Sequence, residues 1–72
     1  MIILIDTVGL ILKGDDKGAH VKVLDDRANT GGYLIVVSSS ISCDGGYDDW
    51  VENFSDLEEY FLESNWEIEW CI

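Results

Sequence analysis

The sequence has few positive charges, and none of them lies after Arg27. Four Lys or Arg stand against 15 Asp or Glu, which gives a formal net charge of −11 in 72 residues. A negative surface of this strength repels nucleic-acid phosphates and anionic membranes, so we expect neither as a direct partner. It attracts positively charged surfaces and speeds encounter with them. The composition therefore predicts a basic protein as the partner and leaves the oligomeric state open.

Cysteine and histidine are also scarce, and proline is absent. Cys43 and Cys71 are too few for a disulfide framework and have no companions at zinc spacing, so we expect two reduced, partly buried thiols. His20 is the only histidine and falls within a predicted strand. No Ser or Cys has an evident base beside it, so the sequence indicates no nucleophilic catalysis.

The carboxylates do not form a recognisable catalytic or metal pattern. Adjacent acids at Asp48-Asp49 and Glu58-Glu59 are expected to diverge on the surface rather than share a proton. Asp44 lies near the first pair in a Gly-rich stretch, but this spacing lacks the alternation and the terminal Glu of an EF-hand loop. We therefore expect a protein that is not an enzyme and that binds no cofactor and no metal.

Long apolar runs are missing, yet 47% of the residues are hydrophobic. This fraction argues against disorder, and the length predicts a single domain, 1–72, with a small core. The first six residues lack the basic region of a signal peptide, and Asp6 interrupts their apolar character. No stretch is long enough to span a membrane, so the sequence predicts cytoplasmic residence.

The first half of the chain is typical of an antiparallel meander. An apolar strand is expected over 2–12, bent or bulged near Gly9. Turn residues at 14–18 lead to an alternating strand over 19–25, with Val21 and Val23 on one face and a wetter second face. A turn at 28–32 precedes a β-branched and aromatic strand over 33–37. The two short connections predict three antiparallel strands.

The second half predicts a loop, one helix and a last strand. A polar loop covers 38–46, and a short turn is expected over 48–52. Ser55 and Glu58 match the capping-box pattern, which favours a helix over 56–64 that ends at Asn65. Apolar residues also recur at helical spacing from Trp50, so a helix that starts near Asp48 is the alternative. Clean alternation over 66–72 predicts a strand with its Trp and Ile residues on one face. The expected fold is α+β in the order β-β-β-α-β.

The candidate partner-binding surface is the acidic and aromatic segment before and within the predicted helix. Such a segment protrudes and enters a cleft, with Trp50 as an anchor surrounded by charge. The alternative for Trp50 is a core position, and for the acids a solvated helix face. Solvated helices usually mix signs, however, and no opposite charge lies nearby in the sequence. The candidate residues are Asp44, Tyr47, Asp48, Asp49, Trp50, Glu52, Asp56 and Glu59.

Four stretches together resemble the small acidic, Trp-rich immunity proteins of bacterial polymorphic and contact-dependent toxin systems: residues 30–35, 46–52, 57–61 and 66–70. The resemblance covers about half of the chain. It implies a cytoplasmic protein that neutralises a toxin domain, often a nuclease, by binding at or beside its active site. The alternatives are a phage-encoded acidic DNA mimic that blocks a restriction or defence enzyme, and a structural subunit whose acidity serves solubility.

Overall fold

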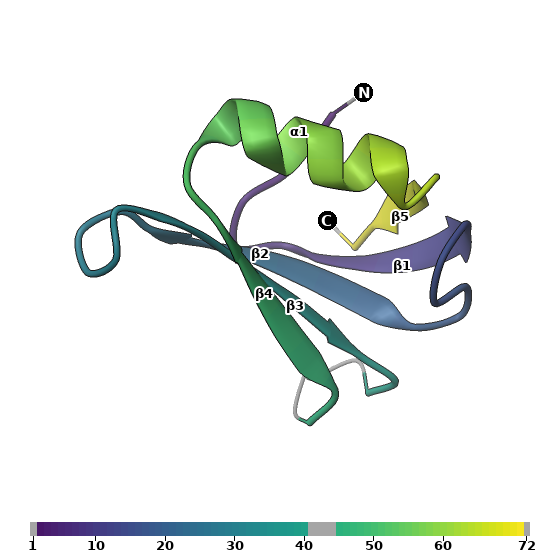
Figure 1. Ribbon diagram of the computed structural model, residues 1–72. Helices are drawn as coiled ribbons and strands as arrows, with labels where there is room; N and C mark the ends of the chain where they lie inside the picture. Colours follow the sequence, from purple (N-terminus) through teal and green to yellow (C-terminus); the bar gives the residue numbers. More distant parts are fainter. Residues whose placement is uncertain (1, 41–44, 72) are drawn as a thin grey trace.

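The computed structural model describes residues 2–40 and 45–71, which form five strands and one helix (Figure 1). The strands make one antiparallel sheet in the spatial order β4-β3-β2-β1-β5, so β4 and β5 are its edges. The element bounds are β1 (Val8–Lys13), β2 (His20–Asp26), β3 (Gly32–Ser38), β4 (Tyr47–Val51), α1 (Phe54–Glu63) and β5 (Glu67–Trp70). The α+β class and the antiparallel meander of β1, β2 and β3 are confirmed.

Strand β4 corrects the predicted topology, which had four strands and a turn at 48–52. Residues Tyr47–Val51 pair in continuous register with β3, from Val37 opposite Tyr47 to Tyr33 opposite Val51. Asp is depleted in strands, so the residue preferences of Asp48 and Asp49 argue against a strand at this position. Pairing with the preceding strand, β3, prevails over this preference. The same strand shows that a helix from Asp48 is wrong.

Helix α1 begins two residues before the predicted start. Its N-cap is Asn53, in an extended conformation, and the Asn53 side chain accepts a hydrogen bond from the Asp56 amide at 2.8 Å. The expected Ser55 cap is wrong, because Ser55 already lies in the first turn. The earlier start brings Phe54 into edge-on contact with Tyr33, at 5.9 Å between ring centroids. Asn and Ser are both good N-caps, and this tertiary contact favours the first.

The predicted C-terminal cap is confirmed. Asn65 adopts a positive φ of 56°, and the Trp66 amide donates back to the Phe61 carbonyl at 3.3 Å. These bonds satisfy carbonyls that a helix end leaves free. The β1–β2 turn covers the same end, since Asp15 donates its amide to the Ser64 carbonyl at 3.0 Å.

The N-terminal segment differs from the single bent strand expected over 2–12. The strand begins only at Val8, because Asp6 has a positive φ of 57° and donates its amide to Val23. The register irregularity lies between Ile11 and Lys13 rather than near Gly9. Gly9 has a different role: a Cβ atom there would lie 2.4 Å from Ile68 Cγ2. The side chains of Ile68 and Trp70 on β5 therefore lie over the bare backbone of Gly9.

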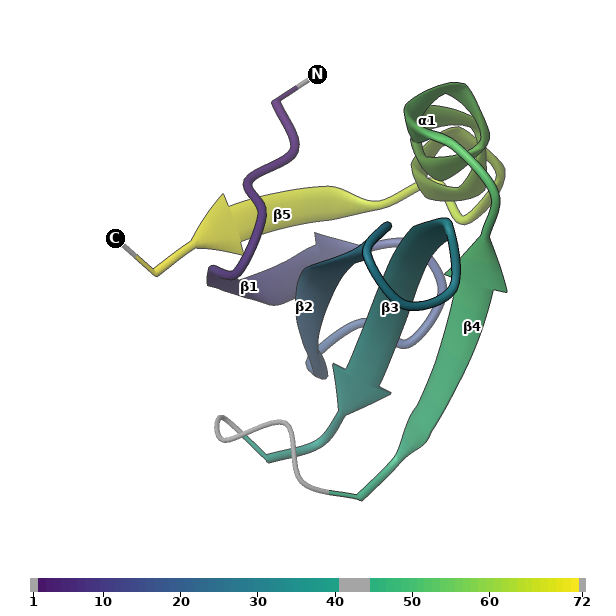
Figure 2. The same ribbon diagram turned by 90° about the vertical axis from the view of Figure 1, so that its left-hand side faces the viewer.

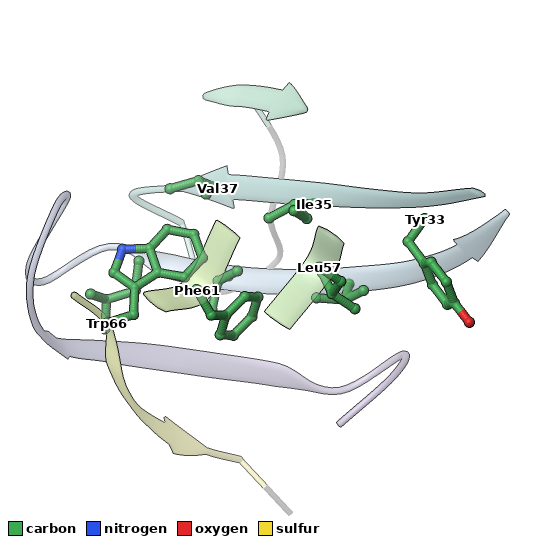
Figure 3. Close-up of a cluster of buried hydrophobic side chains, with 9 residues drawn as sticks. Tyr33, Ile35, Val37, Leu57, Phe61 and Trp66 are labelled. Atoms are coloured by element: carbon green, nitrogen blue, oxygen red, sulfur yellow. The ribbon is translucent and has the colours of Figure 1, made fainter. Parts of the chain in front are cut away.

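The two faces of the sheet differ. We call the side under α1 the covered face, and it carries the core (Figure 3). We call the opposite side the open face, because no described helix or strand packs on it (Figure 2). The core residues are Ile11, Val21, Val23, Tyr33, Ile35, Val37, Leu57, Phe61 and Trp66. The described side chains of the open face alternate with these along the strands and include Val8, Leu10, His20, Lys22, Leu24, Leu34, Val36, Asp48 and Trp50.

The C-terminal strand agrees with its predicted alternation. Trp66 is buried, Ile68 and Trp70 pack against the core, and the two intervening glutamates are exposed. Ile72 lies outside the described residues, as does Cys43. Cys71 is exposed, so the expectation that it is partly buried is wrong. No helix in the described ranges is long and apolar enough to cross a membrane.

Candidate protein-binding surface

Strand β4 is an exposed edge that carries half of the candidate binding residues. Tyr47, Asp48, Asp49 and Trp50 are all exposed, and β4 pairs only with β3. Alternation along the strand places Tyr47 and Asp49 on the covered side and Asp48 and Trp50 on the open side. The expected cluster of Asp48, Asp49 and Glu52 around Trp50 is therefore wrong for Asp49, and the acids of β4 point in two directions.

On the covered side, two phenol–carboxylate hydrogen bonds fix β4 to its surroundings. The Tyr60 hydroxyl of α1 donates to Asp49 at 2.5 Å, and the Tyr47 hydroxyl donates to Asp16 in the β1–β2 turn. Partial burial and the bond to Asp16 raise the pKa of Tyr47 to about 12. Partial burial and the bond to Asp49 also raise the pKa of Tyr60. Both phenols therefore stay neutral and tie strand, helix and turn together at ordinary pH.

On the open side, Trp50 is held in one place. Its indole Nε1–H donates to Thr30 Oγ1 at 2.8 Å. The ring lies over Gly32, where an added Cβ atom would come within 2.7 Å of indole carbons. Trp50 nevertheless remains 47% exposed. It is thus a rigid aromatic surface whose order is established before any partner arrives, as an interface anchor requires.

The remaining candidate acids extend from the end of β4 along α1. Glu52 is exposed in the β4–α1 connection and Glu59 on the helix, whereas Asp56 is half-buried in the first turn. A carboxylate in that turn is favourable near the positive end of the helix dipole. The last turn has no basic residue to balance Glu63. Asp44 lies outside the described residues.

No cation among the described residues neutralises this surface. The ion pairs are Lys13 with Glu67 at 3.5 Å and Arg27 with Asp25 at 2.7 Å, and neither includes a residue of β4 or α1. The four Lys and Arg residues all belong to β1, β2 and their flanking turns. Folding therefore preserves the separation of charge seen in the sequence, with β4 and α1 carrying only negative charges.

In the described part of the chain, no group of three or more His, Cys, Asp or Glu side chains is arranged to hold a metal ion. His20 is half-buried on the open face, and its Nδ1 has no hydrogen-bond partner there. The best-formed hollow in this part of the chain is a shallow depression of about 500 Å³, lined by Asp25, Arg27 and Ala28. An exposed ion pair borders it.

The contacts that organise this surface join residues distant in sequence. Tyr47 and Asp16 are 31 positions apart, and Trp50 and Thr30 are 20 apart. No local pattern signals that Asp16, Thr30 and Tyr60 position the candidate residues. The chain matches no protein-family model, no curated protein and no solved structure, so its geometry and charge are what bear on its function.

Proposed function

We propose that this protein is an immunity-type inhibitor that binds and occludes a basic toxin domain, with a nuclease as the fitting class. The observation that supports it is the exposed β4 edge beside α1, rich in carboxylates that take part in no ion pair of the described residues. Nuclease clefts present cations to substrate phosphate. Carboxylates such as Glu52 and Glu59 are suited to pair with those cations in place of the phosphates.

The aromatic side chains give this surface more than charge. Trp50 presents a fixed indole on one side of β4, and Tyr47 is 43% exposed on the other. Large rigid aromatics that fill a pocket, surrounded by charge, are the usual energetic centre of a tight interface. The free backbone edge of β4 adds main-chain donors and acceptors that suit an extended segment of the partner.

A DNA mimic receives less support from the shape of the molecule. Such a mimic needs carboxylates at phosphate-like intervals along an extended surface. The protein measures 29 × 24 × 22 Å along its principal axes, and its β4 acids point to both sides of the sheet. We therefore retain the toxin inhibitor as the single proposal.

The proposal is tested with the protein that the neighbouring gene encodes, which is expected to be a basic toxin nuclease domain. Co-expression is expected to restore growth, and the Glu52→Lys/Glu59→Lys variant is expected to bind at least ~10-fold more weakly. The matched control is Glu67→Lys/Glu69→Lys on the opposite edge strand, which makes the same charge change. The association rate is expected to fall steeply with added salt, while the dissociation rate changes less.

Each part of this test has an outcome that contradicts the proposal. Absence of both binding and protection rejects the inhibitor function. An association rate that stays flat from low to high salt rejects the electrostatic mechanism. Normal binding by the Glu52/Glu59 variant and weak binding by the Glu67/Glu69 variant moves the binding surface to β5.

A further inference from the structure

The open face is apolar at its centre, and no described element covers it. Leu24, Leu34 and Val36 are half-buried there and alternate with core residues of the same strands. Trp50 pairs in register with Leu34 and adds the largest exposed side chain of this face. Apolar sheet faces are stable when a second layer packs on them. The described chain supplies such a layer, α1, to the covered face alone.

One row of side chains across this face carries opposite charges on either side of a valine. Lys22 pairs in register with Val36, and Val36 pairs with Asp48. Lys22 and Asp48 therefore flank Val36 at one strand spacing on each side, about 4.8 Å. Neither takes part in the ion pairs that the described residues form. A rotation of 180° about Val36 exchanges the positions of the two charges. The row on one copy is therefore complementary to the same row on a second copy.

We propose that two copies of this chain pack open face to open face, around a two-fold axis that runs along β3. Such a rotation places β2 of one copy over β4 of the other. Lys22 then lies over Asp48 of the second copy, and the symmetry of the dimer makes this ion pair twice. Val36 lies on the axis and meets its own counterpart.

The neighbouring row fits the same axis. Leu24, Leu34 and Trp50 lie side by side on β2, β3 and β4. The rotation puts Leu34 against its counterpart and Leu24 against Trp50 of the second copy. Because Thr30 and Gly32 hold the indole in place, Trp50 loses little conformational freedom on association. The first row thus pairs opposite charges on either side of a valine, and the second row pairs apolar side chains throughout.

Most of the negative charge does not lie in this interface. The net charge of −11 opposes self-association, and its screened repulsion grows as copies approach. Helix α1, which carries four acids, however, lies on the covered side of the sheet, opposite the proposed interface (Figure 2). The helix faces outward in the dimer, where salt and water screen its acids. The proposal does not rest on the toxin-binding function, but Asp48 and Trp50 belong to both surfaces, so the second copy and the toxin would compete for the open side of β4. Lys22 belongs to the dimer surface alone.

The test is the molar mass in solution, measured by sedimentation equilibrium from low micromolar to near-millimolar protein. The unaltered chain is expected to reach twice the 8.1 kDa of one copy. Lys22→Asp and Asp48→Lys each place like charges opposite each other, so each is expected to weaken the dimer at least ~10-fold. The combined K22D/D48K variant exchanges the two charges and is expected to restore the dimer.

The control is Lys17→Asp, which makes the same charge change in the exposed β1–β2 turn and is expected to leave the dimer intact. A second measurement needs no variant: mixed labelled and unlabelled chains are expected to show NMR contacts between Val36 methyl groups of different copies. A mass of one chain at every concentration overturns the proposal, as does a K22D/D48K variant no more dimeric than the single variants. If the unaltered chain is monomeric and Lys22→Asp weakens toxin binding instead, the open face belongs to the toxin.

Discussion

The two faces of the sheet come from the same strands, yet they are organised for different tasks. The covered face is closed by α1 and by aromatic contacts, such as the edge-on pair of Phe61 and Trp66 at 4.9 Å between ring centroids. The open face has the same alternation but no second layer, and charges and an exposed indole interrupt its apolar centre. In so small a domain the core needs only one face for stability, so the other is available for binding.

The negative charges are not confined to one of the two faces of the sheet. Strand β4 contributes acids to both sides, and on the covered side Asp49 accepts a hydrogen bond from the hydroxyl of Tyr60. On the open side Asp48 takes part in no ion pair of the described residues. Neighbouring carboxylates in one strand therefore have different roles: one supports the fold, and the other is free for a partner.

The largest expected effect comes from truncation at the helix–sheet interface. Phe61 is 1% exposed, and Phe61→Ala is expected to cost about 3–5 kcal/mol of unfolding free energy, close to the whole stability of a domain this size. Leu62 is the next residue on α1 and is 62% exposed, so Leu62→Ala is the matched control with an expected change below about 0.5 kcal/mol. Urea unfolding followed by circular dichroism measures both. Equal losses would show that α1 buries a different face.

Some of this division is visible in the sequence alone, because local alternation reports which side chains share a face. The pairs Val21/Val23 and Ile68/Trp70 were correctly assigned from period-two patterns. Strand β4 was missed, since two consecutive Asp residues disfavour a strand and only pairing with β3 stabilises it. The sequence predicts the candidate binding residues from their acidic or aromatic side chains alone. Their split onto two faces follows from that missed strand.

The second expected effect compares identical residues on the two faces of β3. Val37 is 2% exposed on the covered face, so Val37→Ala is expected to cost about 2 kcal/mol from lost burial and the cavity left behind. Val36 is half-buried on the open face, and Val36→Ala is expected to cost less than about 1 kcal/mol. Unfolding is measured at low micromolar protein, where dimerisation contributes least. A Val36→Ala cost as large as that of Val37→Ala would show that the open face is covered within one chain.

The smallest expected effects come from removing one hydrogen bond on each side of β4. The two variants are expected to differ at alkaline pH. Tyr47→Phe removes the bond to Asp16, and Thr30→Val removes the bond from Trp50, so each is expected to cost about 1 kcal/mol at pH 8. The folded-state pKa of Tyr47 is raised from 10.0 to about 12, by burial first and by Asp16 next. A raised folded-state pKa means that the unfolded chain loses the phenol proton first as the pH increases. The stability that Tyr47 contributes is therefore complete below pH 10 and is lost between pH 10 and 12.

Urea unfolding at pH 8 and pH 11 is therefore expected to distinguish the two variants by how much unfolding free energy each loses between these pH values. Thr30→Val retains Tyr47 and Tyr60, so its stability is expected to fall with pH as steeply as that of the unaltered chain. Tyr47→Phe has no phenol to ionise at this position, so its fall is expected to be shallower, with Tyr60 supplying what remains. If Tyr47→Phe falls as steeply as the unaltered chain, the phenol of Tyr47 is not held neutral by its surroundings. The covered side of β4 would then be as open to solvent as the side that carries Trp50.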